Sequence, residues 1–394
     1  MKLLHTSDWH LGRTFHGADL LADQESVLRH LAEVVEEERV DVVLVAGDVY
    51  DRAVPSAETV QAATRGLARV RAAGAQIVLT SGNHDSALRL GAFAEFLAAG
   101  GLHLRTSIDA IDKPAVFADE HGPLAVYGIP YLEPEPTRQA MGIAAKGHTG
   151  VLTEAMRRVN ADRERRGGRS VVLAHAFVTG GAGSDSERPI AVGGVEHVGA
   201  AVFDGPDYVA LGHLHGPQTL SVRLRYSGSP LAYSFSEAAH SKSVWLLEFD
   251  ADGLAEVRRH QLPVPRELAT VTGKLDALLA DPSHEELLEC YLSVTLTDPV
   301  RPVDAMRRLR ERFSHAVHLD WQPDGGGAAG SLRYVDAVRG RGDAEIADRF
   351  LCDCRGAGPE SSERDLLERA IRASLPEREG RHEEGVPLPA GLGG

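Results

Sequence analysis

The chain has 394 residues, which is enough for two or three domains with full hydrophobic cores. Its composition, 43% hydrophobic and 25% charged residues, is typical of a soluble globular protein. The net charge of −15 argues against binding of nucleic acid or anionic lipid by the whole surface, but it is compatible with a local basic groove or with bound cations. Three cysteines are too few for a disulfide framework, so we expect reduced thiols.

The sequence contains no signal for a membrane or for secretion. No apolar segment is long enough to cross a bilayer, so we expect no membrane association. The first apolar run is very short and ends at Asp8, and it therefore lacks the apolar core of a secretory signal. Together with the reduced cysteines, these features predict a cytoplasmic protein.

Five short apolar segments rich in β-branched residues predict buried strands. Their hydrophobicity is continuous rather than alternating, which is typical of sheets covered on both faces. Helical patterns lie between several of these segments, so we expect an α/β fold with right-handed strand–helix–strand connections. The predicted strands cover residues 2–7, 41–47, 75–82, 170–176 and 208–213, and the predicted helices cover 23–39, 57–73 and 152–166.

The second half of the chain predicts smaller units. Residues 225–230 and 242–250 look like the two strands of a hairpin that could supply a second sheet. The Pro-rich residues 262–267 predict a linker. After the linker we expect a small β-α-β unit, a Gly-rich loop, two helices and a disordered tail rich in Pro, Gly and charge. These parts cover residues 289–322, 325–331, 342–375 and 376–394.

Side chains that can bind a metal ion follow each of the five predicted strands. Ligand sites in α/β sheets collect at the carboxyl ends of the strands, so we expect these side chains to meet in one crevice. The glycines Gly47, Gly82 and Gly212 precede them and permit tight turns and close backbone approach. The side chains are, in chain order, Asp8 and His10, Asp48 and Asp51, Asn83, His84 and Asp85, His175, and His213 and His215.

The donor types indicate the metal and the chemistry. Carboxylates, imidazoles and one carboxamide, with no thiolate, suit Mn²⁺ or another borderline divalent ion. The donors outnumber the needs of one ion, so we expect two, and a two-metal centre fits hydrolysis of a phosphate ester. A histidine near a strand end is usually only a polar residue with a satisfied hydrogen bond. The ordered set of motifs, each behind a predicted strand, favours the metal centre.

The order of the motifs resembles the calcineurin-like metallophosphoesterase superfamily. Within it, the segments TSDWHLG, AGDVYDRAVPS, SGNHDS, YVALGHLH and YSGSPLAYSFSE are similar to the SbcD family of nuclease subunits, over most of residues 1–250. The resemblance implies a four-layer α/β/β/α sandwich with a small α/β capping domain and C-terminal helices. It implies three parts: a phosphoesterase (nuclease) domain over 1–262, the capping domain over 267–335, and a helical partner-binding segment with a disordered tail over 336–394.

The resemblance also implies roles for the site residues. One metal would be held by Asp8, His10, Asp48 and His215, and the second by Asp48, Asn83, His175 and His213. Both ions would be Mn²⁺, with a water or hydroxide between them as nucleophile. His84 would face the scissile phosphate and protonate the leaving oxygen.

Three further polar residues near the site have other interpretations than metal ligand. Asp85 could orient His84 as a second catalytic residue, or it could serve a turn or a helix cap. Asp51 could support the site or a structural turn. We expect His5, within the first strand, to be a core histidine.

By the same resemblance, the activity would be that of a Mn²⁺-dependent DNA nuclease, exonucleolytic from 3′ to 5′ on duplex ends and endonucleolytic on hairpins. The partner would be an SbcC-type coiled-coil ATPase, in a complex with two copies of each subunit, which also implies a homodimer of this chain. Such a complex would act in DNA end processing, replication and recombination. The chain itself has no P-loop motif, so ATP dependence would come from the partner.

Two surface features could bind these partners. The basic stretches 157–169 and 301–312 could contact DNA phosphates, or they could be solvated helix faces with local ion pairs. An apolar stripe on the last predicted helix could pack on the chain's own capping domain or on another protein. The stripe consists of Leu366, Leu367, Ala370, Ile371 and Leu375.

Two other functions compete with the nuclease. The same site could hydrolyse a small cyclic nucleotide or a phosphoprotein, although such an enzyme needs neither a capping domain nor a partner helix. The fold could also be a scaffold without catalytic activity. In that case we would expect neutral residues at some ligand positions, and none is replaced.

Overall fold

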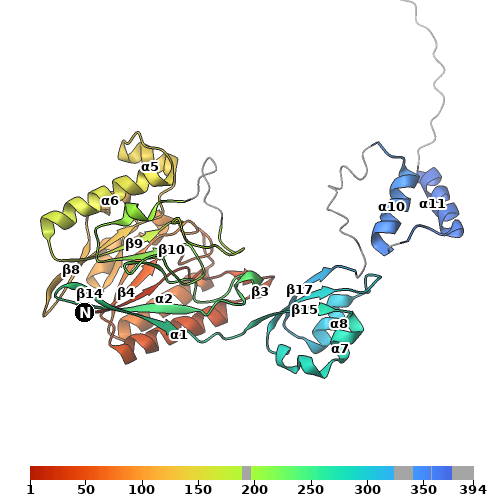
Figure 1. Ribbon diagram of the computed structural model, residues 1–394, viewed down its shortest axis with the longest axis horizontal. Coiled ribbons are helices and arrows are strands. Elements are labelled where there is room, and N and C mark those ends of the chain that lie inside the picture. The colour runs from red at the N-terminus through yellow and green to blue at the C-terminus, as the bar shows by residue number, and fades with distance from the viewer. Residues whose placement is uncertain (189–196, 324–339, 356, 375–394) are drawn as a thin grey trace, which may run out of the picture. The chain divides into compact units, whose positions relative to one another are not determined.

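A computed structural model describes residues 1–188, 197–323, 340–355 and 357–374 (Figure 1). The chain divides into two compact units. The first contains Met1–Thr270, Glu285–Ser293 and Phe313–His318, and the second contains Val271–His284, Val294–Arg312 and Leu319–Gly394. The predicted Gly-rich loop, Leu375 and the predicted disordered tail lie outside the described residues.

The first six-stranded sheet has the order β14-β13-β1-β4-β5-β6. Strands β1, β4, β5 and β6 are parallel, and β13 pairs with β1 in the antiparallel direction, with Leu4 opposite Leu246. Strands β13 and β14 form a long hairpin. The strands cover β1 Lys2–Thr6, β4 Val42–Ala46, β5 Gln76–Thr80, β6 Leu102–Leu104, β13 Ser243–Asp250 and β14 Gly253–Gln261.

The second six-stranded sheet has the order β11-β12-β10-β9-β8-β7. Its four inner strands are parallel, and β7 and β11 pair at the two edges in the antiparallel direction. A separate short hairpin is formed by β2 (Thr14–Phe15) and β3 (Ala18–Asp19). The strands of the sheet cover β7 Ala115–Asp119, β8 Gly122–Ile129, β9 Arg169–His175, β10 Tyr208–Gly212, β11 Gln218–Thr219 and β12 Leu224–Tyr226.

The two sheets face each other, and helices cover their outer faces (Figure 1). Leu3 and Leu44 of the first sheet and Val171 and Leu173 of the second belong to one buried cluster between the sheets. Period-2 alternation sends the neighbouring residues to two outer clusters, which lie beneath helices. The helices are α1 Leu21–Glu38, α2 Ala57–Ala72, α3 Ala87–Leu90 and α4 Ala94–Ala99 with the first sheet, and α5 Pro134–Met141 and α6 Gly147–Arg166 with the second.

The predicted four-layer α/β/β/α sandwich is confirmed by this arrangement. The five predicted strands and three predicted helices are present, with ends that differ by a few residues. The predicted hairpin of residues 225–230 and 242–250 is wrong, because β12 joins the second sheet and β13 joins the first. Sequence patterns indicated a strand at each place, but the pairing of strands depends on long-range contacts.

A small three-stranded sheet follows the phosphoesterase sandwich in sequence, in the order β15-β16-β17. Helix α10 is joined to α11 by an ion pair between Arg364 and Asp348 at 2.8 Å. Short 3₁₀ helices cover Ile108–Ala110, Ala200–Phe203, Phe235–Glu237 and Pro282–Leu287. The remaining elements are β15 Leu268–Gly273, α7 Leu275–Ala280, β16 Tyr291–Leu296, α8 Ala305–Arg312, β17 Ala316–Trp321, α10 Asp343–Arg355 and α11 Ser361–Ser374.

Candidate metal centre

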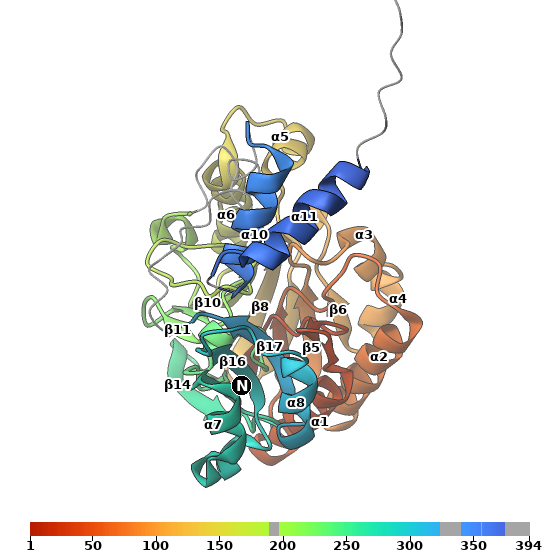
Figure 2. The ribbon, with the colours of Figure 1, turned by 90° about the vertical axis from the view of Figure 1, so that its right-hand side faces the viewer.

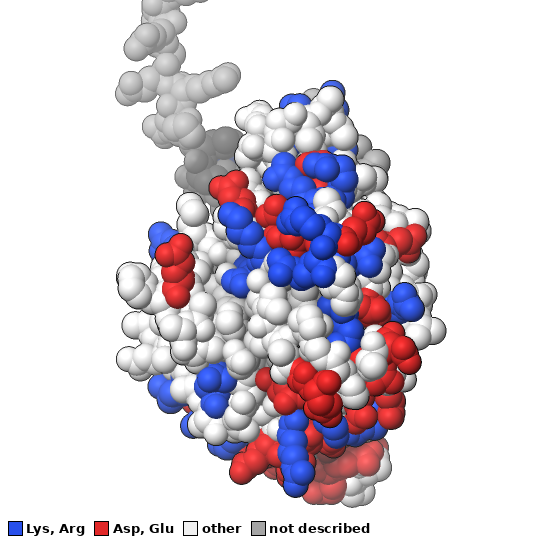
Figure 3. Space-filling view, turned by 90° about the vertical axis from the view of Figure 1, so that its left-hand side faces the viewer, with Lys and Arg blue, Asp and Glu red and all other residues white. Residues whose placement is uncertain are grey.

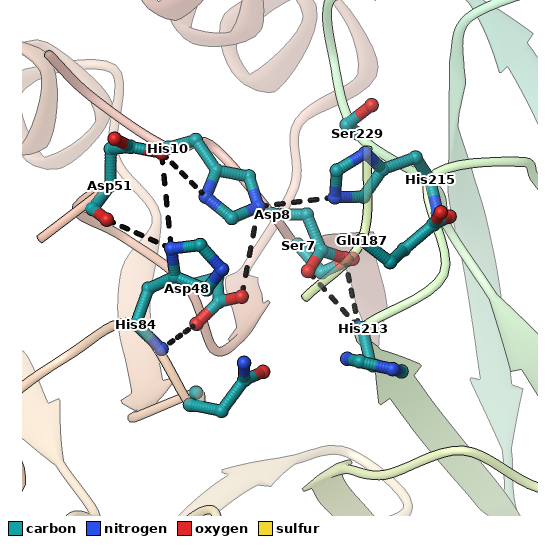
Figure 4. A network of polar contacts seen from close by, with 12 residues as sticks. Ser7, Asp8, His10, Asp48, Asp51, His84, Glu187, His213, His215 and Ser229 are labelled. Atoms are coloured by element: carbon teal, nitrogen blue, oxygen red, sulfur yellow. Dashed lines mark hydrogen bonds and ion pairs between the residues drawn. The ribbon is translucent and has the colours of Figure 1, made fainter. Parts of the chain in front are cut away.

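The predicted ligands lie at the carboxyl ends of strands from both sheets. Asp8 and His10 follow β1, and Asp48 follows β4. His175 is the last residue of β9, and His213 follows β10. The crevice is therefore built between two facing sheets rather than along one sheet. Figure 4 shows the side chains of His10, Asp48 and His215 close together in it.

Backbone strain marks the turns that carry the ligands. Asp8, His10, Asp48 and His213 have φ angles of 54°, 44°, 50° and 110°. Residues other than glycine rarely adopt positive φ, and each such residue costs about 1–3 kcal/mol unless its surroundings impose it. Hydrogen bonds from the N–H of Asp8 to the carbonyl of Gly47 and from that of His10 to the carbonyl of Asp48, both 3.0 Å long, tie the two turns together.

Two of the predicted glycines are required by close packing at this edge. A Cβ on Gly212 would lie 1.9 Å from the carbonyl oxygen of Ala46, and one on Gly82 would lie 2.1 Å from a carboxylate oxygen of Asp48. Real Cβ atoms never approach so closely. The glycines therefore let the ends of β5 and β10 touch the end of β4, as predicted.

One group of candidate ligands consists of Asp8, His10 and His215, which are at most 1% exposed. The Nε2 atoms of His10 and His215 are 3.1 Å apart and face each other (Figure 4). Both oxygens of Asp8 accept the N–H of His213, at 3.0 and 3.1 Å. These three side chains match the first predicted ligand set without Asp48.

Asp48 lies between the two halves of the centre. One of its carboxylate oxygens is 3.6 Å from Nε2 of His10 and 3.4 Å from Nε2 of His175. The same His175 atom is 2.9 Å from the carboxamide oxygen of Asn83. Asp48 also groups with Asp8 and His175, and separately with His10 and His84, with all ligand atoms of a group within 4.8 Å of one another. This position is consistent with the bridging role expected for Asp48.

His213 belongs to none of these groups among the described residues, although its ring lies 5.4 Å from that of His175. The groups also include His84, for which no metal-binding role was predicted. The assignment of His213 and Asn83 to the second ion therefore stays a prediction.

Two family models match the chain, one after the other along the sequence. The model for the calcineurin-like phosphoesterase matches residues 1–217, more than half of the chain. The chain belongs to the calcineurin-like phosphoesterase family. A second model, the SbcD C-terminal domain described as "Type 5 capsule protein repressor C-terminal domain", matches residues 264–353. The resemblance to SbcD-type nucleases is thereby confirmed.

Solved structures similar to this phosphoesterase come from several organisms. TT1561 of Thermus thermophilus is 15% identical, with 66% of this chain and 98% of that chain covered and a TM-score of 0.39. A dimetal phosphatase from Danio rerio is 13% identical, with 66% and 96% covered and a TM-score of 0.40. The calcineurin-like phosphoesterase YfkN from Bacillus subtilis is 14% identical, with 66% and 90% covered and a TM-score of 0.37.

Electrostatics favour the neutral, metal-binding form of His10 and His213 and, without a bound ion, the charged form of His175. Burial lowers the pKa of His10 and of His213 well below the usual range. Burial alone would raise the pKa of Asp48. The charge of His175, its hydrogen bond to Asp48 and the charge of His10 outweigh burial and hold the pKa of Asp48 well below its usual range. Burial likewise opposes protonation of His175, and Asp48 and Asp8 outweigh it, raising the pKa of His175 to about 9. Burial raises the pKa of Asp8 to about 6.

The donor set fits divalent cations. Every candidate donor is a carboxylate oxygen, an imidazole nitrogen or a carboxamide oxygen, and the groups are buried. Among the described residues, no Lys or Arg forms an ion pair with Asp8 or Asp48, so the protein supplies only imidazoles as counter-charges. Buried carboxylates of this kind need compensation, and bound divalent ions would provide it.

His84 is held by Asp51 rather than by Asp85. Its Nδ1 is 2.8 Å from the carbonyl oxygen of Asp51 and 3.8 Å from a carboxylate oxygen of the same residue. The carboxylate of Asp85 instead accepts the backbone N–H groups of Val49, Tyr50 and Gly82 at 2.9–3.1 Å. The geometry favours the turn role for Asp85 and a supporting role in the site for Asp51.

His5 is a core histidine, as predicted. Its ring nitrogens are 3.0 Å from the Tyr208 hydroxyl and 3.1 Å from the Leu211 carbonyl oxygen. The side chain is fully buried on β1, and burial lowers the pKa of His5 to about 3. His5 therefore belongs to the packing of the two sheets and not to the metal centre.

Sequence reasoning missed a buried ion pair behind the centre. Lys242 and Glu237 are each 1% exposed and lie 2.5 Å apart. Burial would raise the pKa of Glu237, but its contact with His215 and the charge of Lys242 hold that pKa below the usual range. Glu237 is the last residue of the segment YSGSPLAYSFSE quoted above. Glutamate and lysine are usually exposed, so the sequence gave no sign that this pair is buried.

Proposed function

We propose that this phosphoesterase is a Mn²⁺-dependent DNA nuclease with 3′ to 5′ exonuclease activity on duplex ends and endonuclease activity on hairpins. The observation that carries the proposal is the match of an SbcD C-terminal domain directly after the phosphoesterase domain. A buried centre with three overlapping ligand groups supports the hydrolytic part of the proposal. Its biological role would be in DNA end processing, replication and recombination, in the cytoplasm, and the free thiols Cys290 and Cys352 are consistent with that location.

The ligands would be divided as the resemblance implies. Asp8, His10, Asp48 and His215 would hold one ion, and Asp48, Asn83, His175 and His213 the other. When bound, such ions act as Lewis acids toward phosphoryl oxygens and activate a water for attack at phosphorus.

His84 would then act on the leaving oxygen. Its Nδ1–H is donated to the Asp51 carbonyl oxygen, so Nε2 is the ring atom left for the substrate. Burial lowers the pKa of His84, whereas Asp48 and Asp51 favour its charged form. The Asp51 carboxylate at 3.8 Å would stabilise the imidazolium that donates its Nε2 proton to the oxygen released from phosphorus.

The basic stretches give little support to DNA binding. Arg157 pairs with Glu154 at 2.7 Å and Arg166 with Asp162 at 3.1 Å, so these cations of α6 have local partners. Arg307 pairs with Glu311 at 2.7 Å in the same way within α8. Figure 3 shows blue and red atoms interspersed on one face of the phosphoesterase unit. Attraction of DNA would therefore come mainly from the bound ions, and contacts of residues 301–312 with DNA stay a prediction.

We also propose homodimerisation through an apolar patch on α3 and α4. Leu88, Phe93 and Phe96 are 91%, 75% and 81% exposed, and Phe93 has a positive φ of 61°. Figure 2 shows α3 and α4 on the same flank as α2. Large exposed apolar side chains in one place are typical of protein interfaces. Light scattering of the Phe96→Glu variant should give a monomer if this patch joins two copies, and an unchanged dimer would exclude it.

The proposed ATPase partner would bind the C-terminal helices. Phe350 on α10 and Leu366 on α11 are each 59% exposed. Leu367 and Ile371 of the predicted stripe are only partly exposed. Co-purification of an SbcC-type coiled-coil ATPase should be lost in the Phe350→Glu, Leu366→Glu double variant. An unchanged complex would place the interface elsewhere.

Cleavage of labelled DNA tests the main proposal. The purified chain, with and without Mn²⁺, would be given a hairpin-ended duplex and, separately, a chromogenic phosphodiester. We expect Mn²⁺-dependent cleavage of both, and its loss in His84→Ala. Hydrolysis of the ester without DNA cleavage, even with the ATPase partner and ATP present, would favour a small-nucleotide or phosphoprotein substrate. Metal binding without turnover of either substrate would favour a non-catalytic scaffold.

A further inference from the structure

His215 is fixed at three points by residues to which the sequence analysis gave no role. Its backbone N–H donates to a carboxylate oxygen of Glu187 at 2.8 Å, and its carbonyl accepts from Nζ of Lys242 at 3.1 Å. On the side chain, Nδ1 is 2.5 Å from the hydroxyl oxygen of Ser186 and 3.4 Å from Glu237. The ring is 1% exposed, so water does not compete for these contacts.

Ser186 connects this ring to the buried ion pair. Its hydroxyl donates to the carboxylate of Glu237, which in turn accepts from Nζ of Lys242 at 2.5 Å. The ammonium group also donates to the hydroxyl of Ser229 at 2.9 Å and to the carbonyl of His215. All three of its hydrogens therefore have acceptors, which is the condition under which a lysine can be buried while charged.

The chain of contacts fixes the tautomer of the neutral ring. Because the Ser186 hydroxyl hydrogen points to Glu237, its oxygen is left to accept the Nδ1–H of His215. That tautomer places the lone pair on Nε2, the atom that faces Nε2 of His10 in the centre. Nδ1–H of His175 is held more simply, by the backbone carbonyl of Ala46 at 3.0 Å, and Nδ1 of His10 has no hydrogen-bond partner. His215 therefore differs in that its support runs through side chains that can be substituted.

We propose that Ser186, Glu237 and Lys242 form a positioning relay for His215. The relay holds the ring in one tautomer and one orientation, and it thereby raises the affinity of the Asp8–His10–His215 group for its metal ion. These residues touch neither substrate nor metal and act through His215 alone. The inference rests on the proposed function only in requiring that the centre binds divalent ions.

A calorimetric titration of the full-length chain with Mn²⁺ alone tests the relay, because it measures the affinity of each metal site. Loss of an outer hydrogen bond to a metal-binding histidine costs about 10- to 100-fold in metal affinity. Ser186→Ala should therefore weaken one of two Mn²⁺ sites about tenfold or more and leave the other unchanged. Ser186→Thr, which keeps the hydroxyl, should restore the affinity. Glu237→Gln should weaken the same site, because the carboxylate that orients Ser186 is lost.

A matched control separates positioning from packing. Ser170 is also a buried serine whose hydroxyl donates to a carboxylate, that of Asp207 at 3.3 Å, but it lies at the opposite end of β9. Ser170→Ala should leave both Mn²⁺ affinities unchanged. Thermal unfolding in chelator establishes that each variant is folded, and Ser186→Ala keeps the test valid should Glu237→Gln or Lys242→Met fail to fold.

The outcomes show whether the relay proposal fails by itself or together with the proposed metal centre. Wild-type affinity at both sites in folded Ser186→Ala and Glu237→Gln would overturn the relay alone. A wild-type chain that binds no Mn²⁺ would overturn the metal centre and the relay with it. Selective weakening of one site would support the relay, whether or not the wild-type chain cleaves DNA.

Discussion

The two edges of the paired sheets bury charge in different ways. At the amino ends of the parallel strands, the guanidinium of Arg169 binds the carboxylate of Asp119 at 2.6 Å, with side chains 4% and 12% exposed. At the carboxyl ends, Asp8 and Asp48 are buried as deeply, but the described chain offers them no Lys or Arg at ion-pair distance. The amino edge contains the cation that neutralises its buried carboxylate. At the carboxyl edge, we expect a cation from solution to neutralise Asp8 and Asp48.

This difference separates a structural charge from a functional one. A buried ion pair with both partners present needs nothing further, and removing one partner leaves an uncompensated charge. Buried carboxylates that have imidazoles but no Lys or Arg beside them among the described residues form a binding site instead. The variants below test whether the two edges can be altered independently.

The largest effect is expected for Asp48→Asn at the carboxyl edge. Asp48 belongs to two of the three ligand groups, and the amide is a far weaker metal ligand than the carboxylate. Hydrolysis of the chromogenic phosphodiester with Mn²⁺ should fall about a thousandfold, or ~4 kcal/mol in activation free energy. Activity within a few-fold of wild type would show that Asp48 does not hold the ions.

At the amino edge, Asp119→Asn should affect stability and leave metal binding unchanged. Breaking a buried ion pair costs about 3 kcal/mol or more, because Arg169 would remain buried without its anion. Denaturant unfolding in chelator measures this loss. Glu25→Gln, which removes the partner of the more exposed Arg65, is the control and should cost less than about 1 kcal/mol. Equal losses in the two variants would remove the distinction between the edges.

Metal binding should stabilise the fold only while the carboxyl edge is intact. At a Mn²⁺ concentration of a hundred times Kd, the free energy of unfolding of the wild type should rise by about 2.7 kcal/mol for each ion bound. In Asp119→Asn, Mn²⁺ should raise the free energy of unfolding by the same amount from a lower starting value. In Asp48→Asn, Mn²⁺ should raise it only slightly. Unfolding curves with Mn²⁺ and with chelator give both quantities. A full rise in Asp48→Asn would contradict the proposed ligand set.

Local signals made the carboxyl edge predictable from sequence. The ligands sit directly behind continuous apolar runs, and Gly82 and Gly212 stand where the strand ends must touch. The type of each ligand and its place in the strand order are properties of short segments, so both could be predicted. That the crevice lies between two sheets depends on β9 and β10 pairing within the second sheet and not with β1, β4 and β5, and no local pattern specifies this.

Other parts of the site depended on contacts that are distant in sequence. Ser186 reaches His215 across 29 positions, and a serine in a polar stretch gives no sign of such a partner. Asp85 follows His84 directly, which suggested a contact between them. Its side chain instead binds the backbone near Val49, because the direction of a side chain in a tight turn depends on backbone angles that the sequence does not reveal.

The smallest effect is expected for His5, which is buried in the core between the two edges. Burial there favours the neutral form of its imidazole. Burial lowers the pKa of His5 from 6.5 to about 3, so the folded state resists a proton that the unfolded state binds. The stability from neutral His5 is therefore complete above pH 6.5 and falls as the pH decreases from 6.5 toward 3. At pH 5.5 the loss is about 1.4 kcal/mol relative to pH 8. The His5→Gln variant is neutral at both pH values. Between pH 8 and pH 5.5, its free energy of unfolding, measured with denaturant, should therefore decrease by about 1.4 kcal/mol less than that of the wild type. The variant of an exposed histidine, His121→Gln, should show the same decrease as the wild type. Equal pH dependence of His5→Gln and wild type would mean that His5 is protonated inside the fold.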